Sequence, residues 1–166
     1  MAAADISVER LRELLEYNAE TGVITWRRNR GRALAGCPAG AITRLGYVDI
    51  QIEGNHAQAH RVAWALHFGA WPEKFIDHID GARANNKIGN LREVTALENN
   101  QNQRRAQRNN KSSGLLGVSK NNKDKTWIAK IRVNGKVLHI GRFAEPSEAH
   151  QAYLEAKRRL HAGCMI

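Results

Sequence analysis

Four polar side chains between residues 77 and 99 have the types and spacing that hydrolytic chemistry needs. Asp77 and His78 are neighbours, and Asn90 and Asn99 follow at regular intervals. A carboxylate can hold a divalent cation, and an imidazole can take a proton from water near neutral pH. Amides can position both groups without adding charge beside a phosphate. The set is therefore suited to hydrolysis of a phosphodiester, whose own charge repels hydroxide.

The elements around these residues are expected to bring them to one point. Residues 75–78 predict a strand that ends in the Asp–His pair, and Asp80-Gly81 predicts a turn. Residues 88–94 predict a second strand, and Thr95 is expected to cap a helix that carries Asn99. Two strands and a helix can thus place all four side chains together.

The segment before the Asp–His pair also has a readable pattern. We expect a helix capped by Ser7 and ending near Tyr17, a strand at 23–26, a basic loop at 27–40, a hairpin of strands 48–52 and 56–60 turning at Gly54-Asn55, and a buried helix at 61–67.

The last third of the chain predicts a separate compact unit. Strands are expected to begin at Gly117 and to span 127–133 and 136–143, with Asn134-Gly135 as a strong hairpin signal. Ser147 is expected to cap a helix with apolar residues at helical spacing. Three strands and one helix leave one face of the sheet free for basic side chains.

The positive charge is confined to one end of the chain. Residues 1–98 carry 12 Lys/Arg and 12 Asp/Glu, whereas residues 99–166 carry 14 Lys/Arg and 4 Asp/Glu, so the whole net charge of +10 lies in the second segment. Such segregation is typical of a region that binds a polyanion, and nucleic acid is the commonest one. Solubility alone does not require it.

Composition excludes several other classes of protein. An apolar content of 42% is compatible with a folded core, and no apolar run approaches the roughly 18 residues of a membrane span. The first residues lack the order of a signal peptide, so we expect a cytoplasmic protein of a bacterial or phage-infected cell, with no membrane partner. Cys37 and Cys164 are expected to be free thiols.

The central motif resembles a known family. The segments Asp77-His78-Ile79-Asp80-Gly81, Asn85-Asn86, Asn90-Leu91 and Asn99-Asn100 look like the HNH endonucleases, in the branch of phage homing endonucleases, and the match covers about residues 5–102. The resemblance implies a ββα fold around one divalent metal. It implies His78 as the general base, with its ring held by the Asn90 side chain or by the backbone that Asn90 braces.

The resemblance also implies a metal site and a set of products. Asp77 and Asn99 would hold one Mg²⁺ or Mn²⁺ ion, since oxygen ligands suit hard cations. The products would carry a 5′ phosphate and a 3′ hydroxyl. The ligand register among Asn99, Asn100 and Asn102 stays open, as does the role of His60, which either serves the site or packs beneath it. Asp80 is expected to start a turn, and Asn85 and Asn86 to cap the loop through side-chain to backbone bonds.

The C-terminal unit resembles the AP2 DNA-binding domain. The resemblance rests on Gly117-Val118-Ser119, residues 127–132, Asn134-Gly135-Lys136, residues 140–143 and residues 148–153. Such a domain lays its sheet in the major groove of double-stranded DNA. By strand position, bases would meet Ser119, Asn121, Lys130, Arg132 and His139, and phosphates would meet Lys120, Lys123, Lys136 and Arg142.

We therefore expect an α+β protein with three parts. Residues 1–102 would form the HNH unit with its N-terminal helix and hairpin, residues 103–113 a basic polar linker, and residues 114–166 the AP2-like unit. Arg104, Arg105, Arg108 and Lys111 in the linker are expected to contact DNA, although a plain solvated tether is the alternative. The expected function is site-directed, metal-dependent cleavage of DNA. The alternatives are a DNA-binding regulator with an inactive HNH unit and an RNA-binding protein, and the sequence leaves open monomer or dimer.

Overall fold

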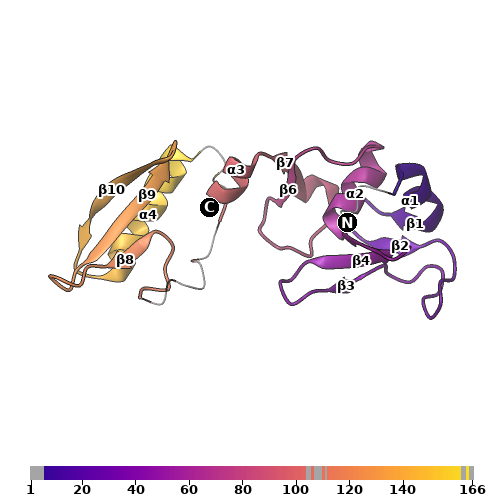
Figure 1. Ribbon diagram of the computed structural model, residues 1–166, viewed down its shortest axis with the longest axis horizontal. Coiled ribbons are helices and arrows are strands. Elements are labelled where there is room, and N and C mark those ends of the chain that lie inside the picture. The colour runs from indigo at the N-terminus through magenta and orange to yellow at the C-terminus, as the bar shows by residue number, and fades with distance from the viewer. Residues whose placement is uncertain (1–5, 104–105, 107–109, 111, 162–163, 165–166) are drawn as a thin grey trace. The chain divides into compact units, whose positions relative to one another are not determined.

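The computed structural model describes residues 6–103, 106, 110, 112–161 and 164, and the chain divides into two compact units, residues 1–95 and 96–166 (Figure 1). Small antiparallel sheets and four α-helices make up the described residues. The α+β class expected from the sequence is confirmed. Arg104, Arg105, Arg108 and Lys111, expected to contact DNA, lie outside the described residues.

The first unit begins with helix α1, Val8–Leu14, which Ser7 caps by accepting a hydrogen bond from Arg10 N at 3.1 Å. The expected end near Tyr17 is wrong, because Leu15–Tyr17 forms strand β1 and pairs with β2, Ile24–Trp26. The helical spacing of Leu11, Leu14 and Leu15 continues across this change because all three side chains face the same core. The sequence pattern therefore overstates the length of the helix.

A second sheet has the order β3–β4–β5, with β3 at Ala41–Ile42, β4 at Val48–Ile52 and β5 at Asn55–Gln58. The turn of the β4–β5 hairpin is Glu53-Gly54, one residue earlier than expected, since both residues have the positive φ of a two-residue turn, +50° and +86°. The returning strand stops at Gln58. His60 therefore lies on a helix and not on a strand.

That helix is α2, Ala59–Phe68, and it organises the core of the first unit. It ends at Gly69, whose φ of +79° is a left-handed C-cap. α2 packs against α1, β1, β4 and β5. Its buried residues Val62, Ala63 and Ala65 join the cluster that holds Leu11 and Ile50.

The Asp–His pair lies on a two-stranded sheet of β6, Phe75–His78, and β7, Leu91–Val94. The expected second strand begins three residues late, because Ile88–Asn90 forms a short 3₁₀ helix (η2). Helix α3, Ala96–Gln101, follows β7 along the chain and is part of the second unit.

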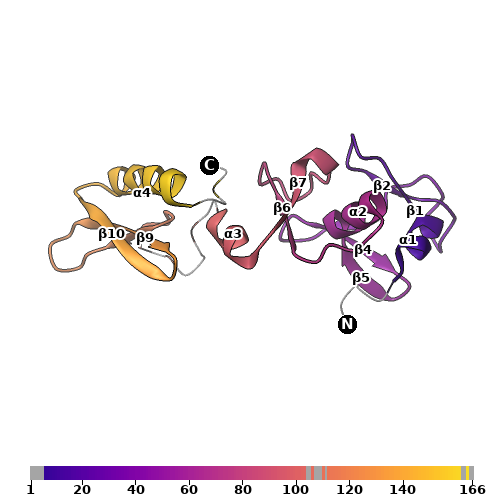
Figure 2. The ribbon, with the colours of Figure 1, turned by 90° about the horizontal axis from the view of Figure 1, so that it is seen from above.

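The second unit contains a three-stranded sheet of order β10–β9–β8 and helix α4, Pro146–Leu160. The strands are β8 at Val118–Lys120, β9 at Trp127–Val133 and β10 at Lys136–Phe143. Figure 2 shows α4 running along one face of this sheet. Ser147 does not cap α4 as expected: the helix begins one residue earlier at Pro146, whose fixed φ suits a first turn.

Strand register assigns side chains of the second unit to two faces. Lys130 pairs with His139, Arg132 with Val137, and Ile128 with both Ser119 and Arg142. Directly opposed residues share a face, and the intervening Ala129 and Ile131 are buried against α4. The sheet therefore presents Ser119, Lys130, Arg132, His139 and Arg142 on the face away from α4.

Two residues of the expected linker are bonded into the second unit. Asn110 Nδ2 donates to Leu115 O at 2.9 Å and to Val118 O at 3.2 Å, and Ser113 Oγ donates to Val118 O at 2.8 Å. These bonds hold the start of β8 in place. They come from residues that precede position 114, where the AP2-like unit was expected to begin. Cys37 and Cys164 are free thiols. Within the described ranges, no helix has the length and apolar character to cross a membrane.

Candidate active site

His78 ends strand β6 in a buried environment formed by other rings. Only 4% of the residue is exposed, and its ring centroid lies 5.1 Å from that of His60 and 6.1 Å from that of Tyr47. Burial lowers the pKa of the His78 imidazole below its usual 6.5, because a charged ring loses its hydration there. The imidazole is therefore neutral near pH 7, which is the form that accepts a proton.

Asn86 is the polar partner of the His78 ring. Its Oδ1 lies 3.2 Å from His78 Nε2, and only 3% of Asn86 is exposed. With the amide oxygen facing the ring, Nε2 carries the hydrogen and donates it, so Nδ1 keeps its lone pair. Asn86 was expected to bond the loop backbone instead. Its contact with His78 fixes one tautomer of the candidate base.

Asn90 braces the loop that follows His78. Its backbone oxygen accepts from Ile79 N at 2.9 Å, and its Oδ1 accepts from Asp80 N at 3.0 Å. Its Nδ2 donates to Asp80 Oδ1 at 2.9 Å and to Asn85 O at 2.8 Å. The Asn90 side chain thus acts on the backbone around His78, while Asn86 faces the ring. A role for Asn90 in catalysis stays a prediction.

Asp80 closes the turn of this loop. Gly81 N donates to His78 O at 2.9 Å, and Ala82 N donates to Asp80 Oδ1 at 2.8 Å. Burial alone would raise the pKa of Asp80, but hydrogen bonds from Asn85, Ala82 N and Asn90 outweigh it and lower the pKa. The carboxylate is therefore ionised, and the hydrogen bonds that it accepts stabilise the turn.

Asp77 is paired with an arginine of the neighbouring strand. Its Oδ2 accepts from Arg92 Nε at 3.1 Å and from Nη2 at 2.9 Å, and the two residues are cross-strand partners of β6 and β7. The Asp77 side chain is 12% exposed. Arg92 therefore holds the carboxylate in place. A metal ion bound at Asp77 would share the carboxylate with the Arg92 guanidinium.

The donor set chosen from the sequence is chemically suited to a hard cation. In the described part of the chain, no three His, Cys, Asp or Glu side chains gather as a metal site. A site made of one carboxylate and one amide oxygen, as Asp77 and Asn99 would form, needs no such group. Asn99 lies on α3 beside Asn100, and Asn102 is buried just after the helix. Their roles as ligands stay predictions.

His60 lies on α2 directly against the candidate base. It is 4% exposed, and burial lowers its pKa to about 3, with smaller contributions from His78 and Arg61. Its ring meets that of His78 at 79°, edge to face, and Tyr47 lies 5.6 Å away. A neutral His60 thus forms part of the wall that excludes water from one side of His78.

Arg83 ties the loop to the neighbouring sheet. Its Nη1 donates to Leu45 O at 2.8 Å, and its guanidinium lies 4.8 Å above the Tyr47 ring. Tyr47 in turn faces both histidines. The β3–β4 turn is therefore connected to the loop after His78 by the Arg83 side chain.

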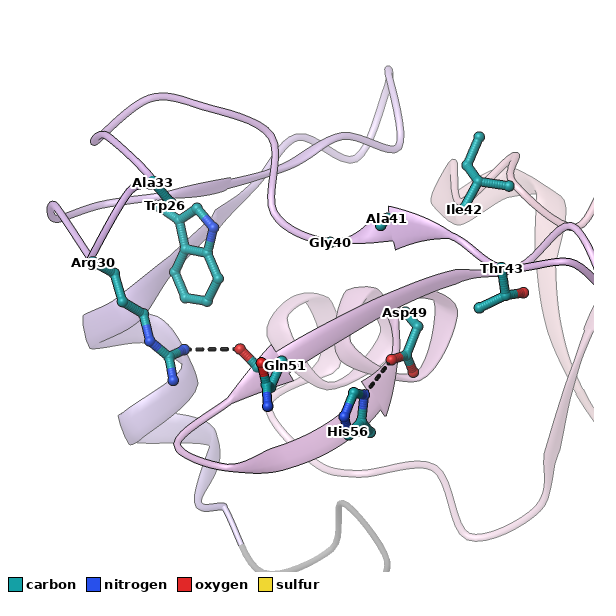
Figure 3. Close-up of a pocket in the computed structure, with 10 residues that line it drawn as sticks. All are labelled: Trp26, Arg30, Ala33, Gly40, Ala41, Ile42, Thr43, Asp49, Gln51 and His56. Atoms are coloured by element: carbon teal, nitrogen blue, oxygen red, sulfur yellow. Dashed lines mark hydrogen bonds and ion pairs between the residues drawn. The ribbon is translucent and has the colours of Figure 1, made fainter.

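A separate surface pocket of about 440 Å³ lies between the basic loop and strands β4 and β5 (Figure 3). Arg30 lies 5.0 Å over the Trp26 ring and donates to Gln51 O at 2.8 Å, while His56 Nδ1 and Asp49 Oδ2 are 2.5 Å apart. The side chains of Arg30, Asp49 and His56 bond protein partners, and none of the lining residues belongs to the motif around His78. We assign no catalytic role to this pocket.

The expected DNA contacts of the second unit divide between the two sides of the sheet. Lys130, Arg132, His139, Arg142 and Ser119 are exposed on the free face. Lys120 and Lys136 pair with Trp127 and Val133, so they lie on the side of α4, and Lys120 Nζ is 5.9 Å from the centre of the Trp127 ring. Asn121 accepts from Lys123 N at 3.2 Å in the turn after β8. DNA contact by these residues stays a prediction.

The comparison with family models agrees with the geometry. Residues 57–101 match the model described as HNH endonuclease, a segment that runs from β5 to the last residue of α3 and contains Asp77, His78, Asn90 and Asn99. No curated protein and no solved structure gave a match. The family match supports an HNH nuclease unit and implies a nuclease that acts on DNA.

Sequence reasoning missed the roles that three residues have around Asp77 and His78. Asn86 holds its ring, Arg92 holds Asp77, and Tyr17 donates to Asn86 O at 2.7 Å. Arg92 could have been found from strand register, since it falls opposite Asp77 in a hairpin centred on the loop. Tyr17 is 69 residues from its partner, and no local pattern indicates such a contact.

Proposed function

We propose that this chain is a metal-dependent, site-directed DNA endonuclease that cuts phosphodiesters to leave 5′-phosphate and 3′-hydroxyl ends. The observation that supports it most is the state of His78: buried, neutral and held through Nε2, within a segment that matches the HNH endonucleases. We further propose that it serves as a homing endonuclease of phage type.

His78 is the general base of the proposed reaction. Asn86 occupies Nε2, so the lone pair of Nδ1 accepts the proton of the attacking water. The Asn90 brace keeps the backbone at Ile79 and Asp80 fixed while the ring gains its charge. Such positioning removes the cost of reorganising the site during the reaction.

Asp77 and Asn99 are the proposed ligands of one divalent cation, Mg²⁺ or Mn²⁺. A hard cation bound there would neutralise charge on the phosphate and on the leaving 3′ oxygen. Arg92 orients the Asp77 carboxylate through two hydrogen bonds. His78 follows Asp77 on the same strand, so β6 carries both the proposed ligand and the proposed base.

The second unit is the proposed recognition module, an AP2-like domain that binds double-stranded DNA through the free face of its sheet. The cations Lys130, Arg132 and Arg142 gather on that face. A catalytic unit with few base contacts gains affinity from a tethered module because its effective concentration on DNA rises. Phosphate contacts would make this binding sensitive to salt.

A plasmid-nicking assay tests the proposal. Wild-type protein with Mg²⁺ is expected to cut, chelation with EDTA to stop cleavage, and His78→Ala to reduce kcat by about 10²-fold or more. Sequencing of the ends reports the chemistry, the strands cut and the target. Equal cleavage by His78→Ala and wild type would remove His78 from its role, whereas DNA binding without cleavage by either would leave a DNA-binding regulator.

A further inference from the structure

The hairpin formed by β1 and β2 touches the loop that carries the partner of His78. Tyr17, at the end of β1, donates from its hydroxyl to Asn86 O at 2.7 Å. In the turn, Ala19 O accepts from Ile88 N at 3.1 Å. Gly22 approaches the same segment so closely that a Cβ there would lie 2.5 Å from Lys87 N. Three consecutive loop residues are thus held from one side.

The hairpin is itself rigid. Asn18 Oδ1 accepts from Glu20 N and Thr21 N, each at 3.0 Å, and Gly22 N donates to Asn18 O at 2.8 Å. Leu15 and Trp26, paired across the two strands, are both buried in the core of the first unit. The turn can therefore act as a fixed reference for the loop it touches.

These contacts converge on one residue. Asn86 receives the Tyr17 hydroxyl on its backbone oxygen, and its side chain reaches His78 Nε2 at 3.2 Å. Asn86 is 3% exposed, so its side chain has little room to reorient without moving the backbone. The position of the Asn86 backbone therefore sets the distance between its amide and the imidazole.

We propose that the β1–β2 hairpin positions the nuclease site, with Tyr17 and Gly22 as positioning residues that hold Asn86 against His78. The inference rests on the proposed function for its effect on cleavage, although its effect on the His78 ring is independent of it. Burial raises the pKa of Tyr17 to about 12, so its hydroxyl remains a donor over the range of a cleavage assay.

Tyr17→Phe removes the hydroxyl and leaves the ring in place. We expect kcat to fall about fivefold and KM for DNA to stay unchanged, because one hydrogen bond is lost at a residue two contacts from the reacting atoms. Tyr153→Phe is the matched control, since Tyr153 lies on α4 in the second unit. It should leave kcat unchanged.

Gly22→Ala tests the close approach independently of the hydroxyl. Its control is Gly36→Ala, because the two glycines have similar φ, +76° and +81°, but nothing lies within 4 Å of a Cβ at Gly36. Both variants carry the cost of a left-handed alanine, and only Gly22→Ala must displace the loop. We expect kcat of Gly22→Ala to be about tenfold lower than kcat of Gly36→Ala. Both variants are measured well below their melting temperatures.

A direct readout of the His78 ring separates positioning from stability. Long-range ¹H–¹⁵N correlations report which ring nitrogen carries the hydrogen, and the signals are assigned by their loss in His78→Ala. Tyr17→Phe is expected to shift them, and Tyr153→Phe is not. Unchanged ring signals, or an unchanged kcat in a protein that cleaves, overturns the proposal. If wild-type protein does not cut DNA, the proposed function fails while the ring signals still decide this inference.

Discussion

The candidate functional side chains of the two units lie in opposite environments. In the first unit the histidines nearest the motif, His60 and His78, are both 4% exposed, and burial lowers both pKa values. In the second unit the cations Lys130 and Arg132 stand exposed on the free face of a sheet. Chemistry on a phosphate needs a positioned, uncharged base, whereas holding a polyanion needs accessible charge. The contrast supports the proposal that the first unit supplies the base for cleavage and the second unit the cations that bind DNA.

The largest expected effect is the loss of cleavage when the Asp77 carboxylate is removed, compared with removal of a carboxylate in the second unit. Asp77→Ala should reduce kcat by about 10²-fold or more, because the proposed metal loses its charged ligand. Asp124→Ala is the matched change in the second unit, where Asp124 is paired with Arg142 at the surface, and should leave kcat nearly unchanged. Cleavage is measured across a Mg²⁺ series. Similar losses in both variants would contradict the proposed role of Asp77 as a metal ligand.

Acid should destabilise the first unit through its buried histidines. The pKa of His60 is about 3 in the folded protein and about 6.5 in an unfolded chain, so the unfolded state binds more protons between these values. Stability is therefore lost as the pH falls below about 6.5, by up to about 1.4 kcal/mol per pH unit for this residue. Residue-resolved hydrogen exchange at a series of pH values measures this loss of stability in the first unit. His60→Phe, which keeps a ring and cannot titrate, should flatten the dependence; an equally steep decline in that variant would exclude His60 as the cause.

Removing two cations from the free face should weaken DNA binding without slowing the chemical step. For Lys130→Ala/Arg132→Ala we expect about a tenfold rise in Kd at low salt and a salt slope smaller by about 2, since each phosphate contact releases counterions. kcat at saturating DNA should be retained. Arg10→Ala/Arg12→Ala on α1 removes the same charge from the first unit. Fluorescence anisotropy distinguishes them, and equal losses would mean that charge alone determines affinity.

The smallest effect concerns the hairpin that shapes the free face. Asn134 has a φ of +48° in the turn between β9 and β10, so Asn134→Ala should destabilise the second unit by about 1 kcal/mol. Asn134→Gly is the control that relieves the backbone. Exchange of the β9 and β10 amides should quicken while the amides of β6 remain protected. Faster exchange of the β6 amides as well would show that the units do not unfold independently.

Local patterns predicted the second unit and much of the first. Asn134-Gly135 specified a hairpin turn, and the spacing of Asp77, His78 and Asn90 was sufficient to recognise the motif. The failures depend on contacts between residues far apart in sequence. Leu15–Tyr17 continues a helical pattern but pairs with β2. Either a helix or a strand would bury Leu15, so the pairing with β2 and not the spacing of apolar residues decides the structure here.

The choice among asparagines could not be made from the sequence. Asn85, Asn86 and Asn90 carry the same amide, and which one faces His78 depends on the path of the loop. That path is held by Tyr17 and Gly22, far earlier in the chain. Residue type predicted the chemistry of the site, while the partner of each group was set by tertiary contacts.

One irregularity in β10 decides which cations the second unit offers. The pairing of β9 and β10 shifts between His139 and Gly141, so Ile140 is an extra residue and Arg142 lies opposite Ile128. If Ile140 paired regularly with Ala129, Arg142 would fall opposite Trp127, on the side of the helix. One residue added between Gly141 and Arg142 would have the same effect, whereas deletion of Ile140 would leave Arg142 opposite Ile128. The bulge at Ile140, and not amino-acid composition alone, therefore determines which face of the sheet carries this charge.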